Sequence, residues 1–349
     1  MKHTIVSKPG FGQMPIILFL LTLLFIIPAQ AQDSTPEAET SIDTYTNPVL
    51  DRDFPDPDVL VVDGAYYAYA TNTDIDGQPI NIQVARSEDL VTWEYVGEAL
   101  PDLHPWARQE FGPQWAPEVT TTDDGYLMYF VTRLALGDGG IQCIGTAISA
   151  APEGPFEPVG AEPFICQQDE GGSIDPSSFV DADGRRYVLW KNDGNSQGRP
   201  TWLYIQPVSE DGLTLEDEPV RLLTVDQPWE GNLIEAPTLW LHDDRYYLFY
   251  SANAYDSRNY GVGYAVSDDL LGPYEKPQRE ALLETRIPEG IVGPGGQDIV
   301  LDEDGNTWML YHNWMGGGYR AMSLVALDWE DGVPVLNPTR APMLRPGSD

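Results

Sequence analysis

The sequence is poor in basic residues. Its 349 residues include 19 Lys and Arg against 55 Asp and Glu, so the formal net charge is −36 at pH 7. A protein that binds nucleic acid through the phosphates needs a basic stripe or patch, and none is present. We therefore expect no nucleic-acid partner. The excess of acid is typical of a chain kept soluble outside the cell, and local calcium sites are the other interpretation.

Cysteine and histidine are also scarce. Cys143 and Cys166 are the only cysteines, there are four histidines, and no cluster of the two types has the spacing of a zinc site. In an exported protein the cysteines could form a disulfide, or they could remain buried thiols, and both readings stay open. No glycine-rich loop leads into a helix, so phosphate and nicotinamide chemistry have no support. We expect no required cofactor.

Long apolar runs are missing except near the N-terminus. There, a weakly basic start, an apolar run over 16–27 and Ala-Gln-Ala ending at Ala31 predict a secretory signal peptide over 1–31. An uncleaved anchor is the alternative, although the run is short for a full span. We expect a secreted protein, extracellular or periplasmic, with no membrane contact after cleavage. The polar, acidic residues 32–44 predict a disordered linker before a folded domain over 45–349.

What the sequence does contain is a repeat of about sixty residues. In each of five segments an acidic turn precedes an alternating aromatic strand, and the turn positions are Gly64, Gly125, Gly184, Asp244 and Gly305. Such turns between alternating strands predict β-hairpins. Units with four strands and no amphipathic helix predict a single all-β domain: a five-bladed β-propeller of four-stranded antiparallel blades around a central channel. Separate small sandwiches are less consistent with the sequence, because no linkers divide the units.

Acidic residues recur at the entrance to the predicted inner strands. A proline precedes four of the hairpins, at Pro57, Pro117, Pro176 and Pro237, and "GPGGQDIV" takes its place in the fifth. The acids beside these prolines are Asp56, Glu118, Asp175 and Glu235. Any one Asp-Pro could be an ordinary strand entry. Several of them on strands that line one channel predict a shared carboxylate pocket, which is costly unless it has a function.

The expected chemistry of such a pocket is glycoside hydrolysis. Two carboxylic groups suffice, since one protonates the leaving oxygen while the other activates water or attacks the sugar. A third carboxylate nearby raises the pKa of the acid. Phe54 and Trp115 lie close to the inner strands and are candidates to stack on a sugar, although each could equally belong to the core.

The whole domain resembles glycoside hydrolase family 43. The motifs that carry the resemblance are, in order, "NPVLDRDFPDPDV", "WAPEV", "SIDPSSF", "IEAPTLW" and "YRAMSLVALDWEDGVPVL". The family contains arabinofuranosidases, arabinanases and β-xylosidases, and the resemblance implies an inverting mechanism. It assigns Asp56, rather than Asp53 or Asp58, as the general base. Asp175 would tune and orient the acid, and Glu235 would be the general acid.

Further expectations follow from the same resemblance. Arg320, shortly before the closing motif, would hold the substrate. Many members carry a His in a Gly-x-Gly-His stretch, where it helps to hold a calcium ion or a water; here "GPGG" places Gly296 at that position. Gln297 beside it and His312 on the next strand are therefore candidates to reach the substrate. A structural calcium ion is compatible with the resemblance but is not needed for acid–base chemistry.

The sequence thus predicts a monomeric, secreted hydrolase of arabinan or arabinoxylan that cleaves α-L-arabinofuranosyl linkages. A β-xylosidase of the same family and a non-catalytic carbohydrate-binding propeller are the alternatives. A retaining, fructan-acting propeller would instead carry Asn-Asp-Pro-Asn and Arg-Asp-Pro motifs, which are absent. Endo or exo action depends on loops that the sequence does not define.

Overall fold

The computed structural model describes residues 45–109, 112–135 and 140–342. The expected signal peptide over 1–31 and linker over 32–44 lie outside these residues. Helical structure in the described part consists of four short 3-10 turns, at Gln168–Glu170, Gly194–Gln197, Pro228–Glu230 and Ile287–Glu289. No helix among the described residues is long and apolar enough to span a membrane.

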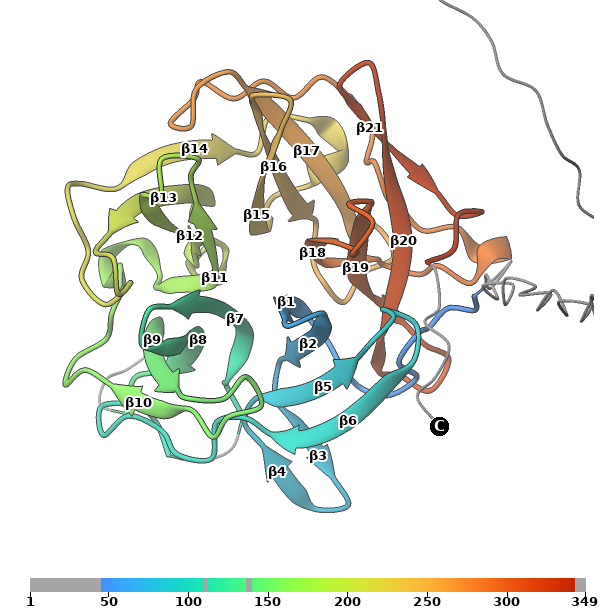
Figure 1. Ribbon diagram of the computed structural model, residues 1–349. Coiled ribbons are helices and arrows are strands. Elements are labelled where there is room, and N and C mark those ends of the chain that lie inside the picture. Colours follow the sequence, from blue (N-terminus) through green and yellow to red (C-terminus); the bar gives the residue numbers. More distant parts are fainter. Residues whose placement is uncertain (1–44, 110–111, 136–139, 343–349) are drawn as a thin grey trace, which may run out of the picture. The chain divides into compact units, whose positions relative to one another are not determined.

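Five antiparallel sheets surround a central channel, which confirms the predicted five-bladed propeller (Figure 1). Blade 1 consists of β1 (Asp58–Val62), β2 (Ala65–Ala70), β5 (Gln83–Ser87) and β6 (Trp93–Glu98), with a side hairpin of β3 (Thr73–Ile75) and β4 (Gln78–Ile80). Blade 2 consists of β7 (Trp115–Thr122), β8 (Gly125–Arg133), β9 (Gln142–Ser149) and β10 (Glu157–Val159).

The remaining blades follow in chain order. Blade 3 consists of β11 (Ser173–Val180), β12 (Arg186–Asn192), β13 (Trp202–Val208) and β14 (Val220–Thr224). Blade 4 consists of β15 (Ile234–His242), β16 (Arg245–Ala252) and β17 (Gly261–Ser267). Blade 5 consists of β18 (Gly295–Leu301), β19 (Thr307–Trp314), β20 (Arg320–Glu330) and β21 (Val333–Asn337).

Blade 4 departs from the expected four strands. Where a fourth strand would run, the chain makes only isolated bridges, Val266 with Glu275 and Val262 with Leu283. Two prolines, Pro273 and Pro277, lie in or beside this segment, and proline has no N–H to donate to a ladder. The edge of this blade is therefore an irregular segment rather than a strand.

The hydrophobic core is divided among the blade interfaces. Each of five clusters of buried side chains joins two neighbouring blades, because successive residues of a strand point to opposite faces of its sheet. On β2, for example, Tyr67 and Tyr69 pack toward blade 2, whereas Tyr66 and Ala68 pack toward blade 5. This packing holds the innermost strands of all five blades against the channel.

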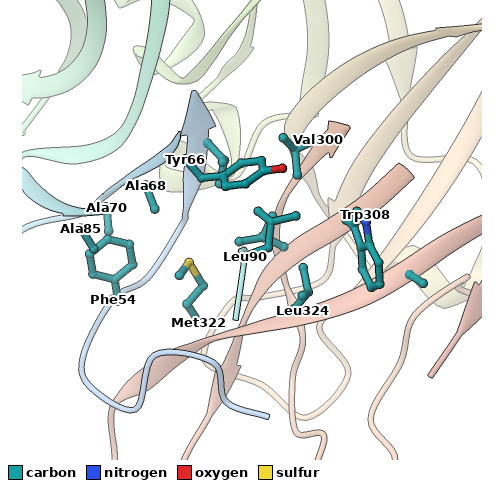
Figure 2. Close-up of a cluster of buried hydrophobic side chains, with 13 residues drawn as sticks. Phe54, Tyr66, Ala68, Ala70, Ala85, Leu90, Val300, Trp308, Met322 and Leu324 are labelled. Atoms are coloured by element: carbon teal, nitrogen blue, oxygen red, sulfur yellow. The ribbon is translucent and has the colours of Figure 1, made fainter. Parts of the chain in front are cut away.

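The chain that precedes β1 packs against blade 5 and so joins the first blade to the last. The N–H of Phe54 donates to the carbonyl oxygen of Arg320 at 2.8 Å, and that of Leu50 donates to Met322 at 3.2 Å. Phe54 and Met322 are fully buried in the cluster between blades 1 and 5, where Figure 2 shows them beside Ala70 and Ala85.

Every inner strand begins with the same backbone irregularity. The residue before the inner-strand proline, or before Gln297 in blade 5, has a positive φ in each blade: Asp56 (54°), Ala116 (39°), Asp175 (53°), Ala236 (50°) and Gly296 (55°). In blades 2 to 5 the strand pairing shifts register across this residue. A bulge of this kind re-aims side chains and is strained for residues other than glycine. Two of the predicted carboxylates, Asp56 and Asp175, occupy it.

The two cysteines are joined in a disulfide. Cys143 lies on β9 and Cys166 lies in the segment before β11, with their Cα atoms 4.7 Å apart. The crosslink closes blade 2 against the chain that leads into blade 3, and it answers a question that the sequence left open.

Candidate active site

A cavity of about 320 Å³ lies at one end of the central channel. Its size is at the lower end of the range for ligand pockets, and it is large enough for a sugar ring. The carboxylates of Asp56, Asp175 and Glu235 all line it, together with Arg320. Asp56 and Arg320 lie 264 positions apart in the chain and meet in one site, because the segment before β1 and the starts of β11, β15 and β20 converge on the cavity.

Asp56 is held in place by three neighbours. Arg320 donates from Nη1 to Oδ1 at 3.1 Å, and Thr71 donates its hydroxyl to Oδ2 at 2.7 Å. The backbone N–H of Asp56 donates to His312 Nδ1 at 3.2 Å. Burial alone would raise the pKa of Asp56, but the Arg320 guanidinium, the His312 ring beside the carboxylate and the Thr71 hydroxyl bring it well below its usual range. Asp56 is therefore ionised at neutral pH, as a general base must be.

Asp175 has the opposite electrostatic environment. Burial and the nearby Glu235 raise the pKa of Asp175 to about 8, although Lys191 opposes the shift. Its Oδ2 accepts the backbone N–H of Ala236 at 3.1 Å, the residue that follows Glu235. Asp175 thus fixes the backbone that carries Glu235 and holds a proton beside it.

Glu235 lies on β15, one residue before the bulge, and is only 9 % exposed. Its Oε2 accepts a 2.9 Å hydrogen bond from the ammonium group of Lys191 on β12. Lys191 has no exposed surface, and Asp193 Oδ1 lies 3.8 Å from its Nζ. Burial opposes the charge, but Glu235, Asp175 and Asp193 raise the pKa of Lys191, so it remains an ammonium ion.

The cavity has an aromatic wall and an aromatic rim. Trp115, the predicted sugar platform, and Tyr260 both line it. Tyr255 also lines it but is 49 % exposed, and its ring lies 4.9 Å from the Arg320 guanidinium carbon. Arg320 is thus held between Asp56 and an aromatic face while part of its guanidinium still borders the cavity. Aromatic surface of this kind suits the apolar face of a sugar.

Three residues expected to contact the substrate lie elsewhere. Phe54 has no exposed surface and belongs to the core between blades 1 and 5. The amide of Gln297 is already engaged, since it donates to the carbonyl oxygen of Ala236 at 2.7 Å and accepts from Ser251 at 2.8 Å. His312 is fully buried behind Asp56, stacked on the ring of Tyr260. The structure therefore corrects these three expectations: the residues support the site from behind.

A second layer of carboxyl groups lies deeper in the channel. Asp58, Glu118 and Asp298 each come two residues after a bulge position, so they face the channel one layer below Asp56. Asp58 accepts the N–H of Val119 and Asp298 accepts that of Val59, both at 2.9 Å, so these groups tie neighbouring blades together. Burial raises the pKa of all three, that of Asp298 to about 8.

Comparison with known proteins decides the family. The family model described as "Glycosyl hydrolases family 43" matches residues 45–334. The chain belongs to this family. The solved structure of a thermostable family-43 glycoside hydrolase superposes with a TM-score of 0.74 at 31 % identity, covering 88 % of this chain and all of that one.

Three curated relatives match most of this chain at 24 to 28 % identity. A β-D-galactofuranosidase of Aspergillus niger is 24 % identical over 86 % of this chain and 84 % of its own length. An extracellular endo-α-(1→5)-L-arabinanase of Bacillus subtilis is 24 % identical over 80 % of this chain and 86 % of its own length. A xylan 1,3-β-xylosidase of Vibrio sp. is 28 % identical over 77 % of this chain, which spans only 49 % of that protein. This family 43 protein is accordingly a glycoside hydrolase.

The family's calcium position does not fit this chain. Gly296, which replaces the family His, has a φ of 55°, and a Cβ there would lie 2.7 Å from both Asp56 Oδ1 and His312 Nδ1. The ring of His312 therefore occupies the room that a side chain at 296 would need. Among the described residues, no group of three or more His, Cys, Asp or Glu side chains could hold a metal ion.

Sequence reasoning missed Thr71, Lys191, Asp193 and Tyr255. A signal for two of them was available, because Thr71 and Lys191 belong to a series with the period of the blades, residues 71, 131, 191, 251 and 312. The residue types in the series differ, so the motif search passed over it. Asp193 and Tyr255 lie in loops, whose paths no strand pattern predicts.

Proposed function

We propose that this family 43 protein is an inverting glycoside hydrolase that cleaves α-L-arabinofuranosyl linkages in arabinan or arabinoxylan. The observation that carries the proposal is the division of charge in the cavity. Asp56 is held ionised by Arg320, whereas burial and the nearby Glu235 raise the pKa of Asp175 to about 8 and keep a proton on it beside Glu235. One side of the cavity is thus prepared to accept a proton and the other to donate one, as acid–base hydrolysis requires.

The proposed reaction uses these groups in a single displacement. Asp56 removes a proton from a water molecule as the water oxygen attacks the anomeric carbon. Glu235 donates its proton to the glycosidic oxygen as the bond between that oxygen and the anomeric carbon breaks. Inverting enzymes leave room for this water by keeping the two carboxyl groups roughly 6.5–9.5 Å apart.

The other cavity residues would orient the reactants. Arg320 keeps Asp56 ionised and, from the border of the cavity, can donate a further hydrogen bond to a sugar hydroxyl. Trp115 and Tyr255 offer aromatic faces to the ring. Asp175 fixes the Ala236 backbone and so the direction in which Glu235 points.

The choice of sugar rests on the relatives. Two of the proteins compared are named for furanoside substrates, a galactofuranosidase and an arabinanase, and this supports a furanosidase. A β-xylosidase is the second candidate, because the Vibrio xylosidase has the higher identity of 28 %. We further propose that the protein is exported by the signal peptide over 1–31, acts as a monomer and needs no cofactor.

A substrate panel tests the proposal. The purified protein is assayed on nitrophenyl α-L-arabinofuranoside, β-D-xylopyranoside and β-D-galactofuranoside, and on linear arabinan. We expect the arabinofuranoside to be cleaved fastest, with Asp56→Asn and Glu235→Gln each losing at least about 10²-fold in kcat. A faster rate on the xyloside would favour the second candidate. Binding of arabinan without hydrolysis, or wild-type turnover by both variants, would reject the proposal.

A further inference from the structure

The ring of equivalent positions on the second strands has a common structural task. In blades 2 to 5 this position pairs with the residue just before the bulge, and in blade 1 it directly follows β2, where its N–H donates to Pro55; the five residues are Thr71, Val131, Lys191, Ser251 and His312. Three of them accept the backbone N–H of the positive-φ residue in the next blade. Thr71 Oγ1 accepts from Ala116 at 2.9 Å, Ser251 Oγ from Gly296 at 2.9 Å, and His312 Nδ1 from Asp56 at 3.2 Å.

Lys191 cannot perform this task, because an ammonium group has no acceptor. The N–H of the next bulge, that of Ala236, instead donates to Asp175 Oδ2. The Lys191 side chain instead reaches the residue before Ala236 on β15 and donates to Glu235 Oε2 at 2.9 Å. In blade 3, therefore, the side chain at this position accepts no backbone N–H. It is a buried cation that donates to the Glu235 carboxylate in the cavity.

A buried ammonium ion at this site requires an explanation. Lys191 has no exposed surface, and removing a charge from water is costly unless close partners compensate for it. Thr, Ser and His perform the structural task at equivalent positions without that cost. The positive charge of Lys191 therefore has a role at this site that an uncharged side chain could not fill.

We propose that Lys191 is a positioning residue that holds the general acid Glu235 by Oε2 and stabilises the carboxylate formed when Glu235 gives up its proton. The inference rests on the proposed function, because it assumes that Glu235 is the acid. With Oε2 engaged by Lys191, the transferred proton sits on Oε1. It moves to the glycosidic oxygen as the bond to the anomeric carbon breaks, and Lys191 keeps all of its own protons.

The other charged groups around Glu235 decide how strongly Lys191 acts on its carboxyl group. The titratable and charged groups that face this pair are Asp56, Asp175, Asp193, Tyr260, His312 and Arg320. Lys191 Nζ lies 2.9 Å from Glu235 Oε2 and attracts its negative charge, whereas Asp193, with Oδ1 3.8 Å from the same Nζ, weakens that attraction. Without Lys191, Glu235 would hold its proton to higher pH and release it less readily to the substrate.

The pH dependence of kcat/KM tests the inference, with Lys191→Met and Lys191→Arg as the variants. For Lys191→Met we expect the basic limb of the profile to move up by about one pH unit or more, as for loss of an adjacent opposite charge. We expect kcat to fall most on substrates with poor leaving groups, which depend on the acid, and least on dinitrophenyl glycosides. Lys191→Arg keeps the charge and should keep the wild-type basic limb.

Lys276 offers a matched control. It is another buried lysine, bonded at 2.7 Å to the buried Glu230, but neither residue lines the cavity. Lys276→Met should lower the melting temperature, as Lys191→Met does, and leave the pH profile unchanged. A profile of Lys191→Met that does not move, or that moves equally in Lys276→Met, would overturn the inference.

Asp193→Asn supplies a second test that does not depend on the folding of Lys191→Met. Removing this negative charge leaves Lys191 to act on Glu235 more strongly, so the basic limb should move to lower pH, the opposite direction. An unchanged or upward limb would overturn the inference. The wild-type protein separates the two proposals. If it hydrolyses no pentoside, the proposed function fails. If it is active but the basic limbs of the Lys191 and Asp193 variants do not move, only the role of Lys191 is rejected.

Discussion

Replacing Arg320 by Met should raise the acidic limb of the pH–rate profile. Arg320 Nη1 lies 3.1 Å from Asp56 Oδ1. At an effective dielectric constant of about 20 this distance corresponds to about 5 kcal/mol of Coulomb energy, an upper bound because water enters the cavity. Opposite charges this close typically change a carboxyl pKa by about 1–3 units. We expect the pKa of Asp56 to rise by about two units in Arg320→Met.

The assay is kcat/KM on an aryl arabinofuranoside between about pH 3 and pH 9. In the wild type Asp56 is ionised across this range, so the acidic limb lies below about pH 3, under the ordinary pKa of an Asp. In Arg320→Met the limb should enter the measured range. Arg320→Lys keeps a positive charge and should leave the limb near its wild-type position, although turnover falls because the paired donors are lost. An acidic limb that stays at its wild-type position in Arg320→Met would refute the electrostatic role of Arg320.

Three further outcomes are expected. The double variant Cys143→Ser, Cys166→Ser should lower the free energy of unfolding by about 3 kcal/mol in urea titrations, because the crosslink closes a loop between residues 23 positions apart. Its kcat should not change. A free energy of unfolding equal to that of the wild type would contradict this. Asp298→Asn should stabilise the protein at pH 8 relative to pH 5: burial raises the pKa of Asp298 to about 8, so wild-type stability is full below about pH 4 and falls as pH rises through 8. A pH-independent difference in melting temperature would oppose that reading. Gly296→Ala should reduce kcat at least tenfold, because its Cβ would meet Asp56 Oδ1 at 2.7 Å, and wild-type kcat would show that the site tolerates the displacement.

The propeller architecture could be predicted because a short sequence motif marks each blade. Acidic turns such as Asp63-Gly64 recur at the blade period, and a turn that needs a positive φ restricts the residue types strongly. The missing fourth strand of blade 4 was harder to predict, because a segment with apolar residues and prolines fits either a strand or an irregular edge. Pairing in the folded protein, rather than residue type, decides between them.

The carboxylates of the site were predictable for a similar reason. Asp56 and Asp175 precede prolines at equivalent bulges, so their spacing alone indicated a shared position. Glu235 precedes its bulge by one residue, yet the bulge turns its side chain into the same cavity. Phe54 was misplaced because an aromatic residue beside an inner strand can face either the cavity or a blade interface, and packing decides which.

The residues behind the carboxylates could not be recognised in advance. Lys191 and His312 hold equivalent positions but bond to different partners, one to a side chain and the other to a backbone N–H. Residue identity does not reveal such an exchange, because it depends on where the neighbouring blade places its own donors and acceptors. The partners of the side chains behind the carboxylates are therefore fixed only when neighbouring blades pack together.

The stereochemistry of the first product tests the central claim most directly. Proton NMR of the hydrolysis of an aryl α-L-arabinofuranoside, recorded within the first minutes, reads the anomer before it equilibrates. Single displacement by a water activated by Asp56 predicts that the β-anomer appears first. Initial formation of the α-anomer would mean net retention through a covalent intermediate and would contradict the roles assigned to Asp56 and Glu235.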